Sequence, residues 1–177
     1  CWAKSDNSNW NSNTGLISKE DSFILHTILA RKIRMFIKSS SGFHYAEYSI
    51  TEDITEWHLY TGTYDGSSIK IYVDGILKST ESISVTIIDN TNRITIGSKE
   101  VSGSSTTYFD GKMSDVRVYN RALSATEISK IYLNTENKVL PKLNNYRNNL
   151  VGHWRLNEND SGSLAYDSTD KRNNGVL

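Results

Sequence analysis

The sequence predicts an all-β chain, folded as an antiparallel sandwich, with one short helix near residues 125–133. Three observations support this prediction. The dominant hydrophobic period along the chain is two, which is the period of a half-buried strand. Turn dipeptides of the Asp-Gly type separate the alternating runs. The runs also recur about every 8–12 residues, a spacing that is typical of sandwiches and barrels.

The alternating runs define the predicted strands. One run places Ile69, Ile71 and Val73 on an inner face and leaves Lys70 and Tyr72 facing outward. Other runs have the same pattern or are rich in β-branched and aromatic residues. The predicted strands are 15–19, 23–29, 32–38, 43–49, 56–64, 68–74, 93–97, 112–119 and 150–156.

Turns and loops separate these strands. Asp74-Gly75 lies between two alternating runs, which is the strongest short signal for a β-hairpin. Two further Asp-Gly pairs, Asp65-Gly66 and Asp110-Gly111, mark turns. Residues 5–14 are predicted to form a polar loop around one tryptophan, and residues 98–107 a loop rich in Ser, Gly and Thr.

The predicted helix has a clear start signal. Ser124 and Glu127 have the spacing of a capping box, in which each side chain binds the backbone N–H of the other residue. Leu123 before the cap and Ile128 after it have the spacing of a hydrophobic staple. The helix is therefore predicted over 125–133.

Composition excludes several classes of function. The chain of 177 residues has 20 basic and 20 acidic side chains, so no net charge draws it to nucleic acid. No apolar run approaches the ~18–20 residues of a membrane span, so we expect no membrane insertion. The single cysteine, Cys1, excludes an internal disulfide. Residues 134–149 are polar, Asn-rich and contain the only proline, and they are interpreted as a linker.

Short motifs follow one another along residues 1–133 in a specific order. Each is weak alone, but their order and spacing together resemble the laminin-G-like or pentraxin-like jelly rolls of the concanavalin A-like lectin/glucanase superfamily. The resemblance implies an antiparallel jelly-roll β-sandwich that lacks its N-terminal strands. The motifs are Cys1-Trp2-Ala3-Lys4, Trp57-His58, Tyr64-Asp65-Gly66, Tyr72-Val73-Asp74-Gly75, Ile94-Thr95-Ile96-Gly97, Phe109-Asp110-Gly111-Lys112 and the run from Ser114 to Ser124.

Residues 150–177 resemble the N-terminal portion of the same family. The motifs are Leu150-Val151-Gly152-His153-Trp154, Ala165-Tyr166-Asp167-Ser168 and Asn173-Asn174-Gly175. In the family this portion comes first, whereas here it follows residues 1–133. Either the chain crosses a tandem array and this portion begins the next repeat, or it completes the first sandwich as in a circular permutant. Both ends are interpreted as cuts in a longer protein.

Candidate catalytic carboxylates are few. A glycosidase needs two carboxylates separated by about 5–9.5 Å and facing one cleft. The best candidate is the segment with Glu52, Asp53 and Glu56, but Ile54 stands at the position where a middle acid belongs. No histidine pair has a metal-ligand spacing, and no serine nucleophile motif is present. The chain is therefore predicted not to be an enzyme.

Calcium is the ion that the resemblance suggests. It implies Asp115, in the Ser-Asp-Val motif, and Asp167, in the Ala-Tyr-Asp-Ser motif, as oxygen ligands. Two alternatives stay open: Asp167 forms a local Asx turn with Ser168, and Asp115 pairs with a neighbouring arginine.

Aromatic side chains beside amides are the usual device for holding a sugar. Trp10 is the leading candidate because Asn9 and Asn11 flank it in a polar loop, and Tyr45 and Tyr108 are further candidates. The alternative for Trp10 is a loop aromatic folded back onto the sandwich. The other three tryptophans, Trp2, Trp57 and Trp154, lie in strand motifs and are predicted to belong to the core.

The resemblance implies a non-catalytic extracellular binding module that recognises a carbohydrate or glycoprotein. It would belong to a secreted, cell-surface or virion protein, and its other partners would be neighbouring repeats or domains of the same longer chain. Two alternatives stay open. One is a structural spacer or adhesion repeat without a small ligand, and the other is an accessory module of a glycoside hydrolase or sialidase.

Overall fold

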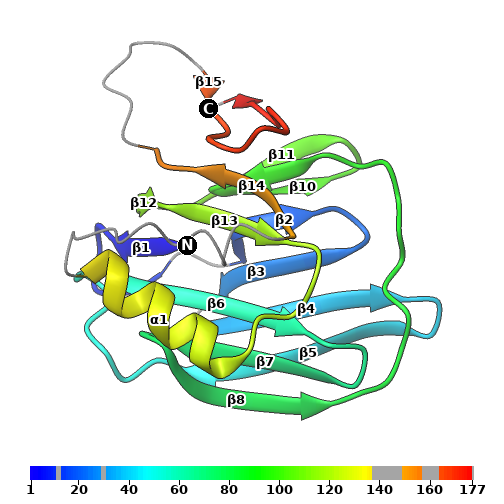
Figure 1. Ribbon diagram of the computed structural model, residues 1–177, viewed down its shortest axis with the longest axis horizontal. Helices are drawn as coiled ribbons and strands as arrows, with labels where there is room; N and C mark the ends of the chain where they lie inside the picture. Colours follow the sequence, from blue (N-terminus) through cyan, green and yellow to red (C-terminus); the bar gives the residue numbers. More distant parts are fainter. Residues whose placement is uncertain (11–12, 29–30, 137–148, 157–163, 177) are drawn as a thin grey trace.

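Two five-stranded antiparallel sheets form the body of the molecule in the computed structural model (Figure 1). The structure describes residues 1–10, 13–28, 31–136, 149–156 and 164–176. One sheet has the strand order β12-β1-β6-β7-β8, and the other has the order β5-β4-β3-β2-β9. This arrangement confirms the prediction of an all-β antiparallel sandwich.

Most strands fall where the alternation predicts them. The first sheet contains β1 (Trp2–Ser5), β6 (His58–Tyr64), β7 (Ser68–Val73), β8 (Ile76–Ser82) and β12 (Gly111–Ser114). The second contains β2 (Thr14–Lys19), β3 (Phe23–Ile28), β4 (Lys32–Ser39), β5 (Gly42–Ser49) and β9 (Ile94–Ile96). Three two-stranded ladders complete the fold, β10 (Ser98–Val101) with β11 (Ser104–Tyr108), β13 (Val116–Tyr119) with β14 (Leu150–Trp154), and β15 (Leu164–Ala165) with β16 (Gly175–Val176).

The core lies between the two sheets. In β4 the side chains alternate strictly, so that Ile33, Met35 and Ile37 point inward. They belong to one buried cluster with Ile69 and Ile71 of β7, both fully buried. Burial of each such side chain stabilises the fold by roughly 1.5–3 kcal/mol. The period of two therefore fixes which face of each strand is buried.

Helix α1 (Ala125–Glu136) lies over the outer side of β6 and β7 (Figure 1). The predicted capping box is present: Ser124 Oγ accepts the Glu127 N–H at 3.3 Å, and Glu127 Oε2 accepts the Ser124 N–H at 2.8 Å. The helix covers Tyr72, which is buried in a second cluster. Tyr72 thus lies on the side of β7 opposite Ile69 and Ile71, as predicted, and it is buried there because the helix adds a third layer.

Residues 98–107 form the β10–β11 hairpin, and the prediction of a loop is wrong. Ser102 and Gly103 both have positive φ, at 52° and 78°, as a two-residue type I′ turn requires. Strand 112–119 is also corrected, because Asp115 has a φ of 50° and separates β12 from β13. The predicted hairpin at Asp74-Gly75 is confirmed by φ values of 52° and 78°.

The two family-like portions of the chain meet at β13. β14 pairs with β13 in antiparallel register, with Val116 opposite Trp154 and Arg117 opposite His153. Asp167 forms an isolated bridge with Trp154, so the segment after residue 164 also contacts β14. Most of the predicted linker, residues 137–148, lies outside the described residues. Among the helical residues that are described, none forms a span long and apolar enough to cross a membrane.

Candidate functional site

The outer surface of β4 and β5 carries a concentrated set of aromatic and charged side chains. Alternation that buries one side of β4 turns the other side to solvent. The β4–β5 register then sets Arg34 opposite Glu47, Phe36 opposite Tyr45 and Lys38 opposite Phe43. We call this surface the β4–β5 face, and it consists of Lys32, Arg34, Phe36, Lys38, Phe43, Tyr45 and Glu47.

Exposed rings are the first feature of the β4–β5 face. Phe43 is 61% exposed and Tyr45 is 46% exposed, although both lie in a regular strand beside an apolar core. The Phe36 and Phe43 rings contact each other, with centroids 4.9 Å apart. Tyr45 lies opposite Phe36 in the register, so three rings gather on this face and part of their aromatic surface is exposed.

Basic side chains hold these rings in place. The Arg34 guanidinium lies 4.0 Å from the centre of the Tyr45 ring, and Lys38 Nζ lies 5.1 Å from the centre of the Phe43 ring. Both distances are within the range of a cation–π interaction. A planar guanidinium stacked on a ring keeps its edge N–H groups free for other acceptors.

Glu47 is the acceptor of the face. Its carboxylate binds Lys32 at 2.7 Å and Arg34 at 2.5 Å. Hydrogen bonds from Lys32 and Arg34 lower the pKa of the Glu47 carboxyl, so it is ionised at neutral pH. The face therefore presents aromatic surface, fixed donors and one fixed acceptor within three cross-strand rows.

His26 of β3 lies at the inner margin of the β4–β5 face, directly opposite Arg34. Its ring is 6% exposed and meets the edge of Phe36 at 6.4 Å between centroids. Neither ring nitrogen has a hydrogen-bond partner among the described residues. Burial, and then the charges of Arg34 and Lys99, lower the pKa of His26 to about 4. The imidazole is therefore neutral at pH 7 and has one unused donor and one unused acceptor.

The β10–β11 hairpin forms a wall beside His26. It packs on the outer side of β2, where Gly15 lies directly opposite His26. A side chain at Gly15 would meet the Ser98 carbonyl, so only glycine permits this approach. Ser18 Oγ donates to the same carbonyl at 3.1 Å and fixes the hairpin on the sheet. The outer side of the sheet is thus open at β4 and β5 and closed at β2.

The predicted sugar-binding residues are placed differently from one another. Tyr45 lies on the β4–β5 face. Trp10 is 2% exposed and packs edge-on against Tyr60 at 5.5 Å. The prediction that Trp10 offers its ring to a ligand is therefore contradicted by its burial, and the alternative of a folded-back loop aromatic describes it. Tyr108 is exposed on β11, Asn9 is exposed, and Asn11 lies outside the described residues.

Two of the three tryptophans assigned to the core are not fully buried. Trp154 is buried as predicted. Trp2 is partly covered by its stacking on Tyr132 of α1 at 5.7 Å. Trp57 is 40% exposed with Lys4 over its ring, so the prediction is wrong there, because Trp57 precedes β6 and no layer covers it.

The carboxylates tested for catalysis have local partners. Glu52 binds Lys78 at 2.8 Å, and Asp53 accepts hydrogen bonds from Thr55 at 3.1 Å and 2.8 Å. These contacts are those of a salt bridge and an Asx turn. They do not form a pair of acids facing one cleft.

Asp115 is held by two basic side chains. Its carboxylate binds Arg117 at 2.8 Å and 2.9 Å and His153 Nε2 at 2.5 Å. Burial alone raises the pKa of Asp115, but the hydrogen bond from His153 and the charge of Arg117 outweigh it and lower the pKa to about 2. A carboxylate whose oxygens are already bound by Arg117 and His153 does not fit a calcium ion.

Asp167 is saturated by backbone and hydroxyl donors. Its oxygens accept the N–H groups of His153, Thr169 and Asn173, each at 2.9 Å, and the Thr169 hydroxyl at 2.6 Å. The contact with the Thr169 N–H is that of an Asx turn at Asp167, which is the local alternative to calcium binding. Among the described residues, no cluster of three or more metal-ligating side chains occurs. Calcium therefore remains a prediction that these two donor sets do not support.

Sequence reasoning missed His26, Arg34, Phe36 and Phe43. The signal was present, because a strand over 32–38 was predicted, although no role was assigned to its outward side. Its outward side combines three basic residues with one ring, which is an unusual composition for a solvated sheet face. What the sequence alone lacks is the β3–β4–β5 register that brings these rows together.

Comparisons with known proteins match this fold. A laminin G family model, described as the concanavalin A-like lectin/glucanases superfamily, matches residues 1–129. A Bacteroides ovatus protein proposed to bind carbohydrate has a TM-score of 0.72 and 19% identity over 99% of this chain and 49% of that chain. This chain therefore spans about half the length of that protein.

A second solved structure is the module CBM40 of the Ruminococcus gnavus IT-sialidase, bound to α2,3-sialyllactose. It has a TM-score of 0.63 and 16% identity over 74% of this chain and 79% of that chain. No curated protein matches. At these identities the structural likenesses concern the fold. The family model covers well over half of the sequence, and the chain belongs to the concanavalin A-like lectin/glucanase superfamily.

Proposed function

We propose that this chain is a non-catalytic carbohydrate-binding module of an extracellular or cell-surface protein, and that the β4–β5 face holds the ligand. The observation that carries the proposal is the exposed Tyr45 ring with Arg34 stacked on it and Glu47 beside it. The similarity to a sialidase module bound to α2,3-sialyllactose supports a glycan as the ligand class.

The chemistry of the face suits a sugar. A pyranose ring has an apolar C–H surface that packs on an aromatic ring, and its hydroxyls need fixed donors and acceptors. Phe43 and Tyr45 supply the flat apolar surface. Arg34 and Lys38 supply donors, and Glu47 supplies an ionised acceptor. Because basic groups outnumber acidic groups here, a glycan carrying a carboxylate is favoured over a neutral one.

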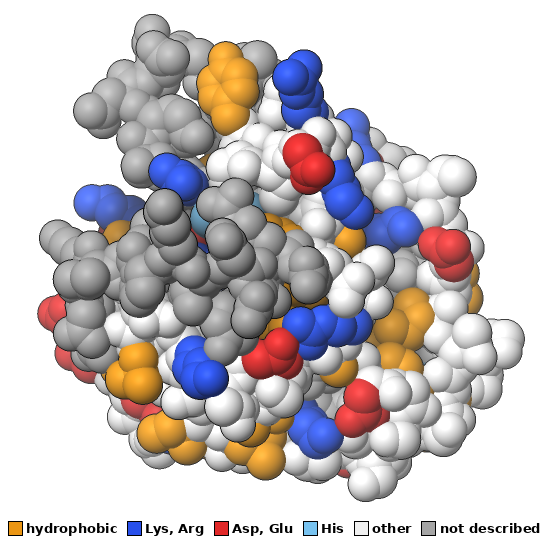
Figure 2. Space-filling view, viewed as in Figure 1, with side chains coloured by type: hydrophobic (Ala, Val, Ile, Leu, Met, Phe, Trp, Pro, Cys, Tyr) orange, Lys and Arg blue, Asp and Glu red, His pale blue; other side chains and the backbone are white. Residues whose placement is uncertain are grey.

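The side of the molecule that carries α1 is less suited to this role. On the side shown in Figure 2, which carries α1, basic and acidic side chains are interspersed and leave no field of one sign. Hydrolysis is not part of the proposal, because Glu47 of the β4–β5 face and Asp21 beside it are both bound by basic side chains. A glycosidase needs one carboxyl as a free acid.

A glycan array followed by calorimetry tests the proposal. The probes are α2,3-sialyllactose and lactose, which differ by the acidic sugar. Tyr45→Ala should weaken binding at least about tenfold, since loss of a stacking surface costs roughly 1.4 kcal/mol or more. Tyr108→Ala is the matched control, since Tyr108 is also an exposed strand tyrosine but lies on β11. Absence of any glycan binding, or an equal loss in both variants, would refute the proposal.

An accessory module of a glycoside hydrolase or sialidase is the second candidate. The similarity to a sialidase module favours it. It shares the same binding face and differs only in what else the longer protein contains. The coding sequence on both sides of this chain would distinguish the two, because only an accessory module has a catalytic domain beside it.

A further inference from the structure

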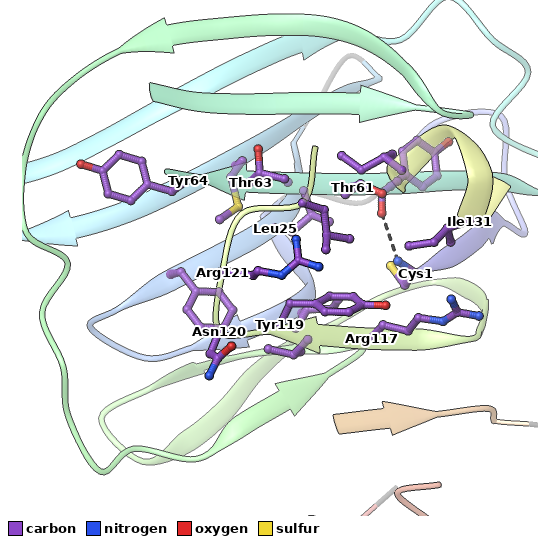
Figure 3. A pocket seen from close by; sticks show the side chains of 18 of the residues that line it. Cys1, Leu25, Thr61, Thr63, Tyr64, Arg117, Tyr119, Asn120, Arg121 and Ile131 are labelled. Carbon is purple, nitrogen blue, oxygen red and sulfur yellow. Dashed lines mark hydrogen bonds between the residues drawn. The ribbon is translucent and has the colours of Figure 1, made fainter. Parts of the chain in front are cut away.

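Arginines that line the cleft between β6 and β13 already have acidic partners (Figure 3). The cleft has a volume of about 350 Å³, and its lining includes Arg117 and Arg121. Arg117 binds Asp115 at 2.8 Å, and Arg121 binds Glu127 at 2.7 Å. Both guanidinium groups are therefore neutralised within the cleft wall, and they do not favour an acidic ligand there.

The cross-strand pair of His26 and Arg34 has the opposite character. The two residues lie opposite each other in the β3–β4 register, and Glu47 continues the same row on β5. Among the described residues, six buried side-chain nitrogen and oxygen atoms lack a hydrogen-bond partner, and three of them belong to this pair. They are both ring nitrogens of His26 and Nε of Arg34. Because buried polar groups are normally paired, this concentration points to a place where a polar ligand group approaches.

Lys99 of the β10–β11 hairpin adds a cation beside this pair. The hairpin packs on β2 at Gly15, which lies opposite His26, so β10 stands next to the row. Lys99 is half-buried, and its ammonium group forms no ion pair with a described residue. Its charge nevertheless acts on His26, as does the charge of Arg34. Two cations from different elements thus act on one neutral imidazole.

Glu47 does not neutralise this cluster. Its carboxylate is already bound by Lys32 and Arg34. Three cations, on Lys32, Arg34 and Lys99, therefore stand against one carboxylate, which leaves two positive charges in excess. Arg34 uses one terminal nitrogen for Glu47 and its flat side for the Tyr45 ring, at 4.0 Å. The Nε–H of Arg34 is left over for another acceptor.

We propose that Arg34 and Lys99, with His26 in the row between them, form an acid-group subsite at the hairpin side of the β4–β5 face, and that this subsite binds the carboxylate of an acidic sugar. The inference rests on the proposed glycan binding and deepens it. β3 and β5 are two strand spacings apart, about 10 Å, so the subsite is within reach of a sugar that packs on Tyr45. Arg34 connects both parts, because it contacts Tyr45 and lies opposite His26.

His26 couples this subsite to pH. Burial, and then the charges of Arg34 of β4 and Lys99 of β10, lower the pKa of His26 to about 4 in the free chain. The charge of Glu47 of β5 has a smaller effect in the opposite direction. Gly15, which faces His26 from β2, has no charge. The charges of Arg34 and Lys99 are therefore the ones that a ligand can offset.

A bound carboxylate offsets the charges of Arg34 and Lys99 and so raises the pKa of His26 toward its ordinary value of about 6.5. His26 then takes up a proton from the solvent when the ligand binds between about pH 4 and 6.5. Because coupling is reciprocal, an acidic sugar should bind more tightly as the pH falls through this range. A neutral sugar has no charge to offset and should bind equally at both ends of the range.

Calorimetry at pH 7 and pH 5 tests the subsite. The acidic probes are α2,3-sialyllactose and glucuronic acid, and the neutral probe is lactose. We expect an acidic probe to bind at least about fivefold more tightly at pH 5, with proton uptake measured from buffers of different ionisation enthalpy, whereas lactose binds equally at both pH values. The acidic probe that shows this effect identifies the source of the carboxylate as a sialic acid or a uronic acid.

Two variants separate the subsite from the aromatic part of the face. His26→Gln retains a hydrogen-bonding side chain that does not titrate, so it should abolish the pH dependence and leave lactose binding unchanged. His44→Gln is its control, because His44 lies on β5 and contacts serine hydroxyls. Lys99→Met should weaken the acidic probe at least about fivefold and leave lactose unaffected. Lys130→Met is its control, because Lys130 is an exposed lysine of α1.

Each outcome decides between the subsite and the proposed function. Acidic probes that bind equally at both pH values, a pH dependence that survives in His26→Gln, or an equal loss of acidic and neutral probes in Lys99→Met would overturn the subsite. Binding of lactose alone, lost in Tyr45→Ala, would also overturn it but would leave the proposed function intact. Acidic probes that depend on Lys99 and not on Tyr45 would support the subsite and refute the role of the rings. No binding of any probe would overturn both.

Discussion

Replacing Asp115 with asparagine tests the buried carboxylate that contacts both β13 and β14. The carboxylate contacts Arg117 of β13 and His153 of β14, so the substitution removes the charge that Arg117 faces and alters the hydrogen bond with His153. Asparagine tolerates the left-handed backbone at this position, where φ is 50°, so the change is confined to the charge and to one acceptor oxygen of the side chain. The expected effect is a loss of stability without a change of fold.

The magnitude follows from the pKa of Asp115. Folding lowers it from 3.8 to about 2, and each pKa unit corresponds to about 1.36 kcal/mol, which gives about 2.4 kcal/mol at neutral pH. Because the folded pKa lies below the unfolded one, this contribution is present above about pH 4 and is lost as the pH falls toward 2. Asp115→Asn should therefore lose about 2–3 kcal/mol at pH 7 and lack that part of the acid dependence.

Urea unfolding at several pH values measures both effects. Asp21→Asn is the matched control, since Asp21 also has a positive φ and binds a lysine at 2.5 Å but is largely exposed. An exposed pair contributes at most about 1 kcal/mol. A loss below about 0.5 kcal/mol for Asp115→Asn, or an unchanged acid dependence, would refute the role assigned to this cluster.

Three further predictions concern other parts of the fold. Gly15→Val should detach the β10–β11 hairpin from β2, because the new side chain meets the Ser98 carbonyl. Hydrogen exchange of the hairpin amides should then accelerate while the core strands stay protected. Unchanged protection of the hairpin amides would contradict this prediction. Stability should fall as the pH drops from about 6.5 to 4, because burial lowers the pKa of His26 to about 4 and the unfolded chain takes up the proton first. His26→Phe should remove up to about 3 kcal/mol of that pH dependence. An identical pH profile of the variant in urea unfolding would argue against this role of His26. The thermal midpoint should be the same in excess calcium as in chelator, because the oxygens of Asp115 and Asp167 already have donors. A higher midpoint in calcium would identify a calcium site elsewhere.

Sheet architecture was predictable because alternation reports directly on burial. The inward sets of β4 and β7 follow from Ile33, Ile37, Ile69 and Ile71 alone. Alternation is less informative where a third layer or a tight turn changes the environment of a residue. Tyr72 is buried by α1, and residues 98–107 pair through a turn at Ser102-Gly103 that a polar composition conceals.

The candidate site was predictable only in part. Tyr45 was found from its residue type, but its partners depend on the pairing of three strands. His26, Arg34 and Glu47 lie in one row only because of the β3–β4–β5 register. Trp10 is the reverse case, because its neighbours in the sequence are polar and yet its ring is buried against Tyr60. Local composition therefore suggests residue types, and tertiary pairing decides which of them act together.

The central claim is that the β4–β5 face binds a glycan. The most direct measurement is an NMR titration of the isotope-labelled chain with the glycan that binds best on the array. We predict that the backbone amides of Arg34, Phe43 and Tyr45 shift together in one saturable process. Shifts confined to the loop around Asn9 or to Tyr108 would contradict the claim.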